Sequence, residues 1–222
     1  MFLIPSPWPT GTGLGAALAL LVIAVGGYFL GCFNGAVIVS KYILHDDVRT
    51  HGSGNAGLTN FHRVFGGPLT FVVILLDVLK AVIAVWLGVQ AFHFAAWPGL
   101  ELYGKYLGGL FCLLGHMFPC MFGFKGGKGI LSGGAMAIMI DWRVALVVWG
   151  GFLILTALTR WVSLGSCSTG LTFPIISWFV YHDLVVLILA LIIGGLILWQ
   201  HRGNIQRLLN GTERKLTFHK KE

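Results

Sequence analysis

The stretch PLTFVVILLDVLKAVIAVWLGVQAF, residues 68–92, decides the class of fold. Its 25 residues contain two charged side chains, Asp77 and Lys80, and apolar residues make up most of the rest. A helix needs about 20 mostly apolar residues to cross the hydrocarbon core of a bilayer. We therefore predict that residues 68–92 form a membrane-spanning helix.

The composition of the whole chain favours the same class of protein. Of its 222 residues, 56% are hydrophobic and 10% are charged, and the mean hydropathy is +0.84. A soluble globular chain carries about 25% charged residues, so these side chains are too few to cover a folded surface. The chain is predicted to be an integral membrane protein, which excludes a disordered chain, a disulfide scaffold and a soluble DNA-binding domain. The four cysteines form no CxxC pair and are interpreted as free packing residues.

Further apolar runs predict an all-α polytopic fold. Five of them approach the length of a spanning helix: residues 14–33, 106–122, 144–158, 162–181 and 184–199. A sixth run, residues 130–140, is too short to cross a bilayer alone, so we expect a half-buried or packed helix there, beside glycine-rich loops. This gives about seven transmembrane helices, one of them short, in a single integral-membrane domain over residues 1–222.

The distribution of Lys and Arg predicts the orientation of these helices. If the N-terminus lies outside, Lys105 and Arg143 are on the outer face, and Lys80 lies within a span. The other twelve basic side chains then share the opposite face: Lys41, Arg49, Arg63, Lys125, Lys128, Arg160, Arg202, Arg207, Arg214, Lys215, Lys220 and Lys221. Cytoplasmic loops are enriched in Lys and Arg. We therefore expect the C-terminus to be cytoplasmic.

The first of three polar clusters on that face is HGSGNAGLTNFHR, residues 51–63. Its three glycines allow backbone N–H groups to turn toward a common point, and such nests bind anions. Short polar side chains and an arginine suited to phosphate are added by Ser53, Asn55, Thr59, Asn60 and Arg63. A flexible loop between two spans is the alternative interpretation, although a spacer has no need of so many small donors.

The second cluster combines GHMFP, residues 115–119, with FKGGKG, residues 124–129. A glycine-rich turn that opens a helix between two lysines is a sensible phosphate cradle. It is not a Walker A loop, because Phe122 and Gly129 stand where that motif requires Gly and Ser or Thr. The alternative is a basic turn that only fixes the topology.

The third cluster is HRGNIQRLLNGTE, residues 201–213, in which His201, Asn204 and Leu208 share one helical face. Taken alone, it fits a basic amphipathic helix on the lipid headgroups equally well. A weaker polar spot on the same side consists of Arg160, Ser163 and Ser166.

Asp77 and Lys80 are three residues apart, and therefore on one face of their helix, near mid-membrane. A charge at that depth costs about 2.5–3.5 kcal/mol on insertion scales. We expect the two to pair inside the bundle and to serve the structure rather than catalysis.

Two anion sites on one face indicate two phosphate-bearing groups, or one substrate held twice. A transporter of a phosphorylated solute is the rival interpretation, but it should show related halves and broken helices at the midplane. The sequence has no HExxH, no GxSxG, no paired carboxylates and no His-x4-Asp pattern of the common glycerolipid acyltransferases. Chemistry at the cytoplasmic surface, on a substrate with one end in lipid, fits better.

The three clusters, in this order, resemble the signature motifs of the bacterial acyl-phosphate:glycerol-3-phosphate acyltransferases, the PlsY family. The resemblance implies a multi-pass enzyme of the bacterial inner membrane, with a periplasmic N-terminus and an active site facing the cytoplasm. Such an enzyme transfers an acyl chain from acyl phosphate to glycerol-3-phosphate, giving lysophosphatidic acid and inorganic phosphate for phospholipid synthesis. The two substrates and membrane lipid are the implied partners, with no cofactor, no metal and no nucleic acid.

The resemblance also implies roles for single residues. Those at the reacting centre would be Ser53, Asn60, Arg63, His201 and Asn204. Those that contact substrate or phosphate would be Gly54, Asn55, Gly57, Thr59, His116, Lys125, Gly126, Gly127, Lys128, Gly129, Ser163 and Ser166. A structural role falls to Asp77, Lys80 and Glu213.

The chain departs from the usual family pattern at residues 31–34, at His62 and at residues 130–132. These departures bear on rate or chain-length preference rather than on the reaction class. Because acyl phosphate is already activated, we expect direct transfer without an acyl-enzyme.

Overall fold

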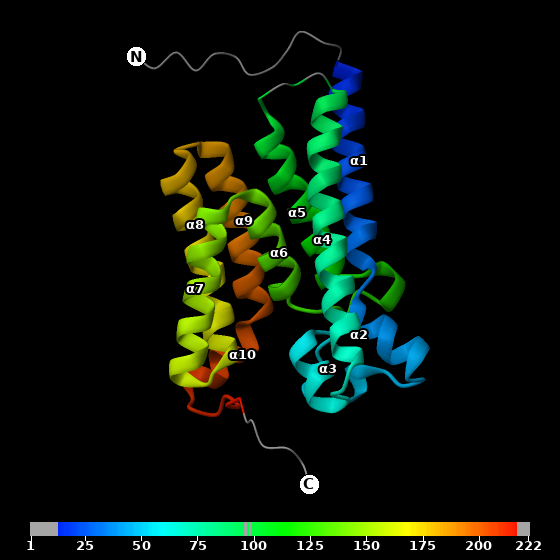
Figure 1. Ribbon diagram of the computed structural model, residues 1–222, viewed down its shortest axis with the longest axis vertical. Helices are drawn as coiled ribbons and strands as arrows, with labels where there is room; N and C mark the ends of the chain where they lie inside the picture. Colours follow the sequence, from blue (N-terminus) through cyan, green and yellow to red (C-terminus); the bar gives the residue numbers. More distant parts are fainter. Residues whose placement is uncertain (1–12, 96, 98, 217–222) are drawn as a thin grey trace. The chain divides into compact units, whose positions relative to one another are not determined.

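The computed structural model describes residues 13–95, 97 and 99–216, and within these residues every regular element is helical (Figure 1). The chain divides into two compact units, Met1–Ile140 and Asp141–Glu222. That residues 1–222 form a single integral-membrane domain stays a prediction.

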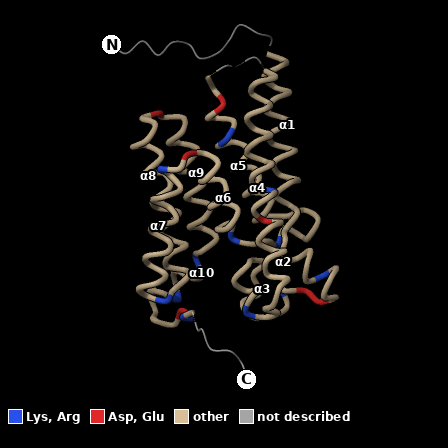
Figure 2. Tube along the Cα trace, viewed as in Figure 1, with Lys and Arg blue, Asp and Glu red and all other residues tan. Residues whose placement is uncertain are grey.

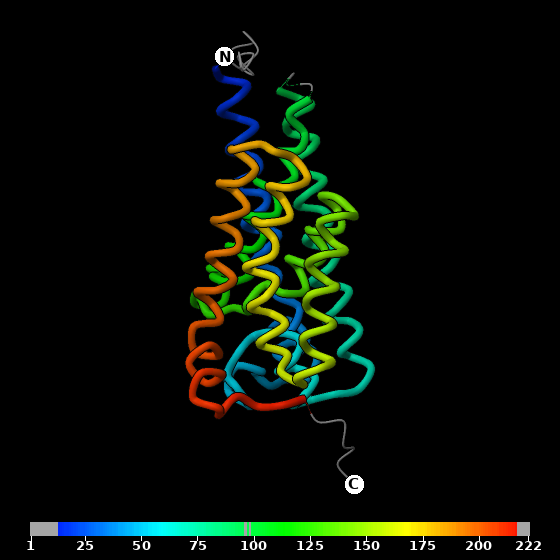
Figure 3. The backbone as a smooth tube through the Cα atoms, turned by 90° about the vertical axis from the view of Figure 1, so that its left-hand side faces the viewer, coloured from blue at the N-terminus to red at the C-terminus, as the bar shows by residue number. Residues whose placement is uncertain are grey.

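The first unit is built around three long helices, α1 (Gly13–Cys32), α4 (Leu69–Phe94) and α5 (Glu101–Met117), which pack against one another (Figures 1 and 3). The short helix α6 (Ile130–Ile140) packs on α4 and α5, and most of its residues are buried. The smaller elements are α2 (Gly35–Ile38), η1 (Val39–Ile43), η2 (Val48–Thr50), α3 (Leu58–Val64) and η3 (Cys120–Phe122).

Glycines let the backbones of these three helices touch. A Cβ atom on Gly88 would collide with the carbonyl of Gly104, and one on Gly115 would collide with the carbonyl of Tyr28. Small residues at helix interfaces allow this close approach in membranes, where van der Waals contact drives association.

The second unit contains α7 (Trp142–Thr159), α8 (Val162–Tyr181), α9 (Leu184–Gln200) and the short α10 (Arg202–Leu209). Helices α7 and α9 begin at the N-caps Asp141 and Asp183, whose side chains accept backbone N–H bonds of the first turn. Helices α7 and α8 end at Arg160 and His182, both in the left-handed conformation. A left-handed residue after the last turn stops a helix, so the chain reverses at both points.

Helices occur at every position where the sequence predicts one, and most bounds agree within two residues. The exception is the run at 106–122: α5 begins at Glu101 and ends at Met117. It ends there because Phe118 precedes Pro119, and a residue before proline avoids the α conformation.

Among the described residues, α1, α4 and α7 are long and apolar enough to cross a membrane, and α9 with α10 would add a span bent by 60°. Large apolar side chains on these helices are exposed, including Leu21, Phe71 and Ile154. Charged residues are scarce along the long helices and gather near their ends (Figure 2). The number of spans and the orientation remain predictions.

Candidate functional site

The first cluster lies in a loop, residues 44–57, and in the helix α3 that follows it. Asn60 is 2% exposed, and its side chain closes this first loop. Its Oδ1 accepts the N–H of Ser53 at 2.9 Å, and its Nδ2 donates to the carbonyls of Val48 at 3.0 Å and His51 at 3.1 Å. Gly52 has a φ of +61°, and a Cβ there would collide with the Asn60 side chain. Asn60 therefore fixes the conformation of the loop through these three hydrogen bonds.

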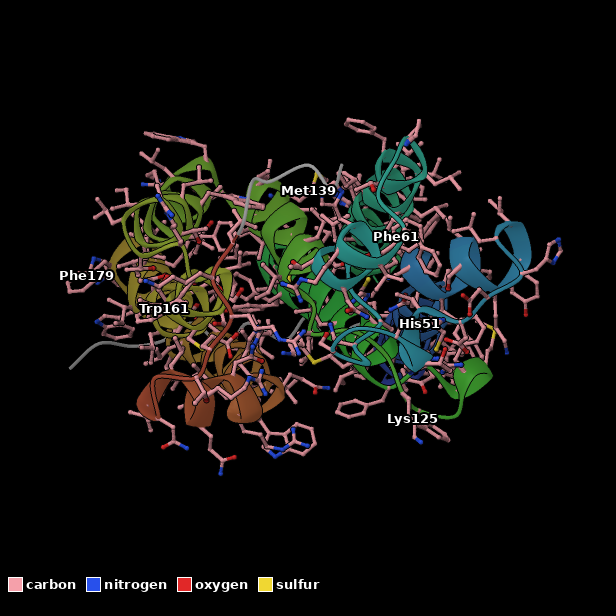
Figure 4. All side chains as sticks on the ribbon, turned by 90° about the horizontal axis from the view of Figure 1, so that it is seen from below. His51, Phe61, Lys125, Met139, Trp161 and Phe179 are labelled. Carbon is pink, nitrogen blue, oxygen red and sulfur yellow. The ribbon has the colours of Figure 1, made fainter. Side chains whose placement is uncertain are left out.

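Three polar side chains of the same cluster, Ser53, Thr59 and Arg63, are exposed and make no hydrogen bond with any described residue. Viewed from below, His51 is labelled between Phe61 and Lys125 (Figure 4). Its Nε2 is 2.9 Å from the carboxylate of Asp46 and donates to it, which lowers the pKa of Asp46. His51 is thereby oriented by Asp46 and makes no hydrogen bond to Ser53.

Arg49 connects the first loop to the second cluster. Its Nε and one terminal nitrogen donate to the carboxylate of Asp47, at 2.9 and 2.8 Å. The other terminal nitrogen donates to the carbonyls of Phe122 at 2.6 Å and Lys125 at 3.2 Å. The hydrogen bonds from Arg49 lower the pKa of Asp47 to about 2. Sequence reasoning used Arg49 only for topology, because a bond to a backbone carbonyl leaves no mark on the partner's sequence.

One of the departures from the family pattern also holds the first loop. Asn34, fully buried after α1, donates from Nδ2 to the carbonyl of Ala56 at 3.0 Å. Its Oδ1 accepts the N–H of Val37 at 3.1 Å and caps α2.

The second cluster forms a glycine-rich loop, residues 118–129, which contains η3 and leads into α6. The N–H of Gly126 donates to the carbonyl of Met117 at 3.2 Å, and that of Gly127 donates to the carbonyl of His116 at 3.1 Å. A Cβ on either glycine would collide with His116. These two N–H groups, which the sequence suggested as part of a phosphate cradle, instead hold the loop on the end of α5. The exposed Lys125 and the start of α6 are left to attract an anion.

Beneath this loop lies a buried cluster of three ionisable side chains, Asp77, Lys80 and His116, which are 1%, 4% and 3% exposed. The Nζ of Lys80 is 2.7 Å from Asp77 Oδ1 and 2.7 Å from His116 Nδ1. The predicted pairing of Asp77 with Lys80 is confirmed. The participation of His116 was not predicted, because 36 residues separate it from Lys80.

The second unit carries the third cluster. His201 is buried, and its Nδ1 lies 2.8 Å from the carbonyl of Ile197. A carbonyl only accepts, so Nδ1 carries a proton. Asn204 donates to one oxygen of Glu213 at 2.8 Å, and Arg207 donates to the other at 2.7 Å.

The weaker spot at the start of α8 lies near Glu213 in the same unit. Burial raises the pKa of Glu213, but the hydrogen bonds from Asn204 and Arg207, with Ser163 close by, bring it below its usual value. Ser166 is buried and bonds back to the carbonyl of Val162 at 2.9 Å. Ser163 is 6% exposed, and its hydroxyl makes no hydrogen bond of ordinary geometry with a described residue. Of the two serines, Ser163 is thus the one whose hydroxyl is directed to Glu213 and not to the backbone of its own helix.

Two networks result, one within each unit. The first unit joins Ser53 and Asn60 to the glycine-rich loop through Arg49, and the second unit joins Asn204 and Glu213 to the surroundings of Ser163.

Comparison with known proteins places the chain among acyltransferases. A sequence model of the family described as glycerol-3-phosphate acyltransferase matches residues 21–211. The glycerol-3-phosphate acyltransferase of Thermoanaerobacter sp. (strain X514) is 36% identical over 196 residues, covering 88% of this chain and 95% of that protein. The one from Halalkalibacterium halodurans is 40% identical and covers 88% and 94%.

A solved structure has a similar fold. It is the glycerol 3-phosphate form of PlsY (YgiH), described as an integral membrane glycerol 3-phosphate acyltransferase. Its sequence is 31% identical, the TM-score is 0.79, and the match covers 90% of this chain and 96% of that one. The lysphosphatidic acid form of the same protein gives a TM-score of 0.76.

Proposed function

Because the chain belongs to the glycerol-3-phosphate acyltransferase family, we propose that it transfers an acyl chain from acyl phosphate to glycerol-3-phosphate. The products are lysophosphatidic acid and inorganic phosphate, made for bacterial phospholipid synthesis. The observation that carries this proposal is the match over residues 21–211, which contains the first two polar clusters whole and the third except for Thr212 and Glu213. The choice of acyl phosphate as donor rests on the resemblance of those clusters to PlsY motifs.

We place the enzyme in the inner membrane of a bacterium, with seven spans, a periplasmic N-terminus and a cytoplasmic C-terminus. The twelve-to-two distribution of basic residues supports this orientation. The three clusters then face the cytoplasm, where glycerol-3-phosphate is dissolved, while the acyl tail of the donor stays between helices.

In the proposed reaction a hydroxyl oxygen of glycerol-3-phosphate attacks the carbonyl carbon of the donor. The new ester C–O bond forms, the bond from the acyl carbon to the phosphate oxygen breaks, and the hydroxyl proton ends on the departing phosphate. The protein has to neutralise two phosphates and align the hydroxyl. Arg63, Lys125 and Lys128 supply the charge, and Ser53 donates to a phosphate or to the developing oxyanion.

The remaining predicted residues keep their proposed places with some refinement from the contacts above. Asn60 acts by shaping the first loop, and Gly126 and Gly127 act by letting the glycine-rich loop sit on His116. His201 and Asn204 complete the reacting centre, and Glu213 holds Asn204.

Turnover by the purified protein tests the reaction. Acyl phosphate, acyl-CoA and acyl carrier protein are offered in turn with glycerol-3-phosphate, and lysophosphatidic acid and phosphate are measured. We expect product with acyl phosphate only. Arg63→Lys keeps the charge but loses the planar fork, so kcat should fall strongly. Glycerol-3-phosphate flux into sealed liposomes without any acyl donor would instead support the rival transporter.

The direct route is tested separately, because Ser53 lies two residues from His51. Enzyme quenched with acyl phosphate alone is examined by mass spectrometry. An unmodified chain and intersecting double-reciprocal lines are expected, while a stoichiometric adduct on Ser53 with parallel lines would rule the direct route out. In the direct route Ser53 acts as a hydrogen-bond donor to a phosphate or to the oxyanion. Removing one oxyanion donor lowers kcat by a factor of about 10²–10³, so Ser53→Ala should be severely impaired.

A further inference from the structure

The buried cluster beneath the glycine-rich loop has a geometry that an ordinary ion pair does not need. The ammonium group of Lys80 has three N–H bonds to donate and no acceptor. Three acceptors surround it: Asp77 Oδ1 at 2.7 Å, His116 Nδ1 at 2.7 Å and the carbonyl of Phe33 at 3.2 Å. Each donor therefore has one partner, and the group is held in a single orientation.

This arrangement also decides which nitrogen of His116 carries the proton. Nδ1 faces a group that can only donate, so Nδ1 must accept. The neutral ring then has its proton on Nε2. Lys80 thus fixes the tautomer of His116, as a second group commonly does for a functional histidine.

The Nε2 side of the ring faces the glycine-rich loop. A Cβ on Gly127 would collide with Nε2, and the N–H of Gly127 is bonded to the carbonyl of His116 at 3.1 Å. His116 Nε2 makes no hydrogen bond with any described residue. A neutral N–H donor is thus directed beside Gly127, next to the two lysines of the loop, and no described residue accepts it.

The helices around the cluster keep it in place. Asp77 Oδ1 also accepts the N–H of Gly35 at 3.2 Å, and Ser132 donates to the carbonyl of Asp77 at 3.0 Å. The start of α2, the middle of α4, the end of α5 and the start of α6 therefore meet at one point. A displacement of the Lys80 ammonium group therefore reaches the glycine-rich loop through the imidazole ring of His116.

We propose that Lys80 is a positioning residue, which orients His116 so that its Nε2–H donates to the phosphate of glycerol-3-phosphate at the glycine-rich loop. This inference rests on the proposed function, because it assigns that phosphate to the loop. Lys80 does not touch the substrate. It acts by fixing the tautomer and the tilt of the histidine that does.

The test has to remove the Lys80 donor without leaving a buried charge. In Asp77→Asn/Lys80→Met both partners are neutral and of similar size, a change that buried ion pairs often tolerate. The matched control is Lys105→Met on α5, the helix that carries His116, where the Lys105 Nζ donates to the carbonyl of Ile140 at 3.1 Å. Folding of each variant is checked by its elution profile and melting temperature in detergent.

The expected result separates substrate binding from turnover. A hydrogen bond to a charged group corresponds to about a 10- to 100-fold change, so KM for glycerol-3-phosphate should rise by about that factor in the double variant. We expect little change in kcat or in KM for acyl phosphate, and no change in Lys105→Met. His116→Gln, whose amide N–H lies near the place of Nε2–H, should be less impaired than His116→Asn. An unchanged KM in the folded double variant would overturn the proposal.

A second measurement does not depend on activity or on the folding of the Asp77→Asn/Lys80→Met variant. The ¹⁵N spectrum of histidine-labelled wild-type protein, with His116 assigned from His116→Gln, should show the Nε2–H tautomer. An Nδ1–H tautomer would overturn the positioning role even in an active enzyme. An enzyme that shows the Nε2–H tautomer but transfers no acyl group would instead refute the proposed function.

Discussion

In the first unit, α1, α4 and α5 touch through backbone at glycines such as Gly31, Gly88 and Gly108, where a Cβ would collide with a carbonyl of the neighbouring helix. In the second unit, α7 and α9 each contain a glycine, Gly150 and Gly195, whose Cβ would meet nothing within 4 Å. The first unit also buries an ion pair, whereas the second begins two helices with aspartate N-caps. The second unit has close backbone contacts too, since a Cβ on Gly194 would collide with the carbonyl of Gly170. The two units therefore differ in the buried ion pair and the aspartate N-caps, and each combines packed with open glycine positions.

The largest effect is expected from breaking the ion pair of the first unit. Asp77→Ala leaves the ammonium of Lys80 buried without its carboxylate, and removing one partner of a buried pair costs about 3–5 kcal/mol. Thermal unfolding in detergent, followed by size-exclusion chromatography, measures the loss. Glu213→Ala, in the half-exposed network of the second unit, is the comparison and should cost far less. Equal losses would show that the two units do not differ in this respect.

Alanine in place of glycine should change stability in opposite directions at a packed position of the first unit and at an open position of the second. In Gly88→Ala the new methyl meets the backbone of Gly104, which cannot move aside, and overpacking of this kind costs about 1–3 kcal/mol. In Gly150→Ala the methyl enters open space, and the gain in helix propensity is up to about 1 kcal/mol. Melting temperatures of both variants check this. A destabilised Gly150→Ala would mean that α7 is packed as closely as α4.

Removing a helix cap should matter in the second unit. The side chain of Asp183 accepts the N–H of Val186 at 3.0 Å, and replacing such a cap by alanine costs about 0.5–2 kcal/mol. The corresponding position before α4 is Pro68, which makes no side-chain cap bond. Pro68→Ala therefore serves as the control and should lose no cap energy. Hydrogen exchange at the first turns of α9 and α4 reads the two effects separately.

The smallest expected effect is a pH dependence of the stability of the first unit. Arg49 holds the pKa of Asp47 at about 2, below its ordinary 3.8. A carboxyl whose pKa is lowered in the folded state stabilises it above the unfolded pKa, and this contribution is lost as the pH falls from about 3.8 toward 2. The stability difference between wild type and Asp47→Asn should shrink over that interval. A constant difference would mean that the Asp47–Arg49 bond does not depend on ionisation.

The positions of the helices could be predicted from the sequence because apolar run length follows membrane thickness directly. The pairing of Asp77 with Lys80 followed from their spacing on one helix. Contacts to backbone carbonyls could not be predicted from the sequence. Arg49 donates to the carbonyls of Phe122 and Lys125, and because every residue has a carbonyl, the sequence does not mark these two as its partners. The use of the Gly126 and Gly127 N–H groups was missed for the same reason.

The bonds that Arg49 makes to the glycine-rich loop reach main-chain oxygens at Phe122 and Lys125. Because these bonds go to main-chain oxygens, they do not depend on which side chains the loop carries. The side chains of Met121 and Phe124 are both exposed. A fluorinated or spin-labelled residue at either position would leave the bonds from Arg49 in place. These two sites therefore offer a way to observe the loop spectroscopically while it remains attached to the rest of the first unit.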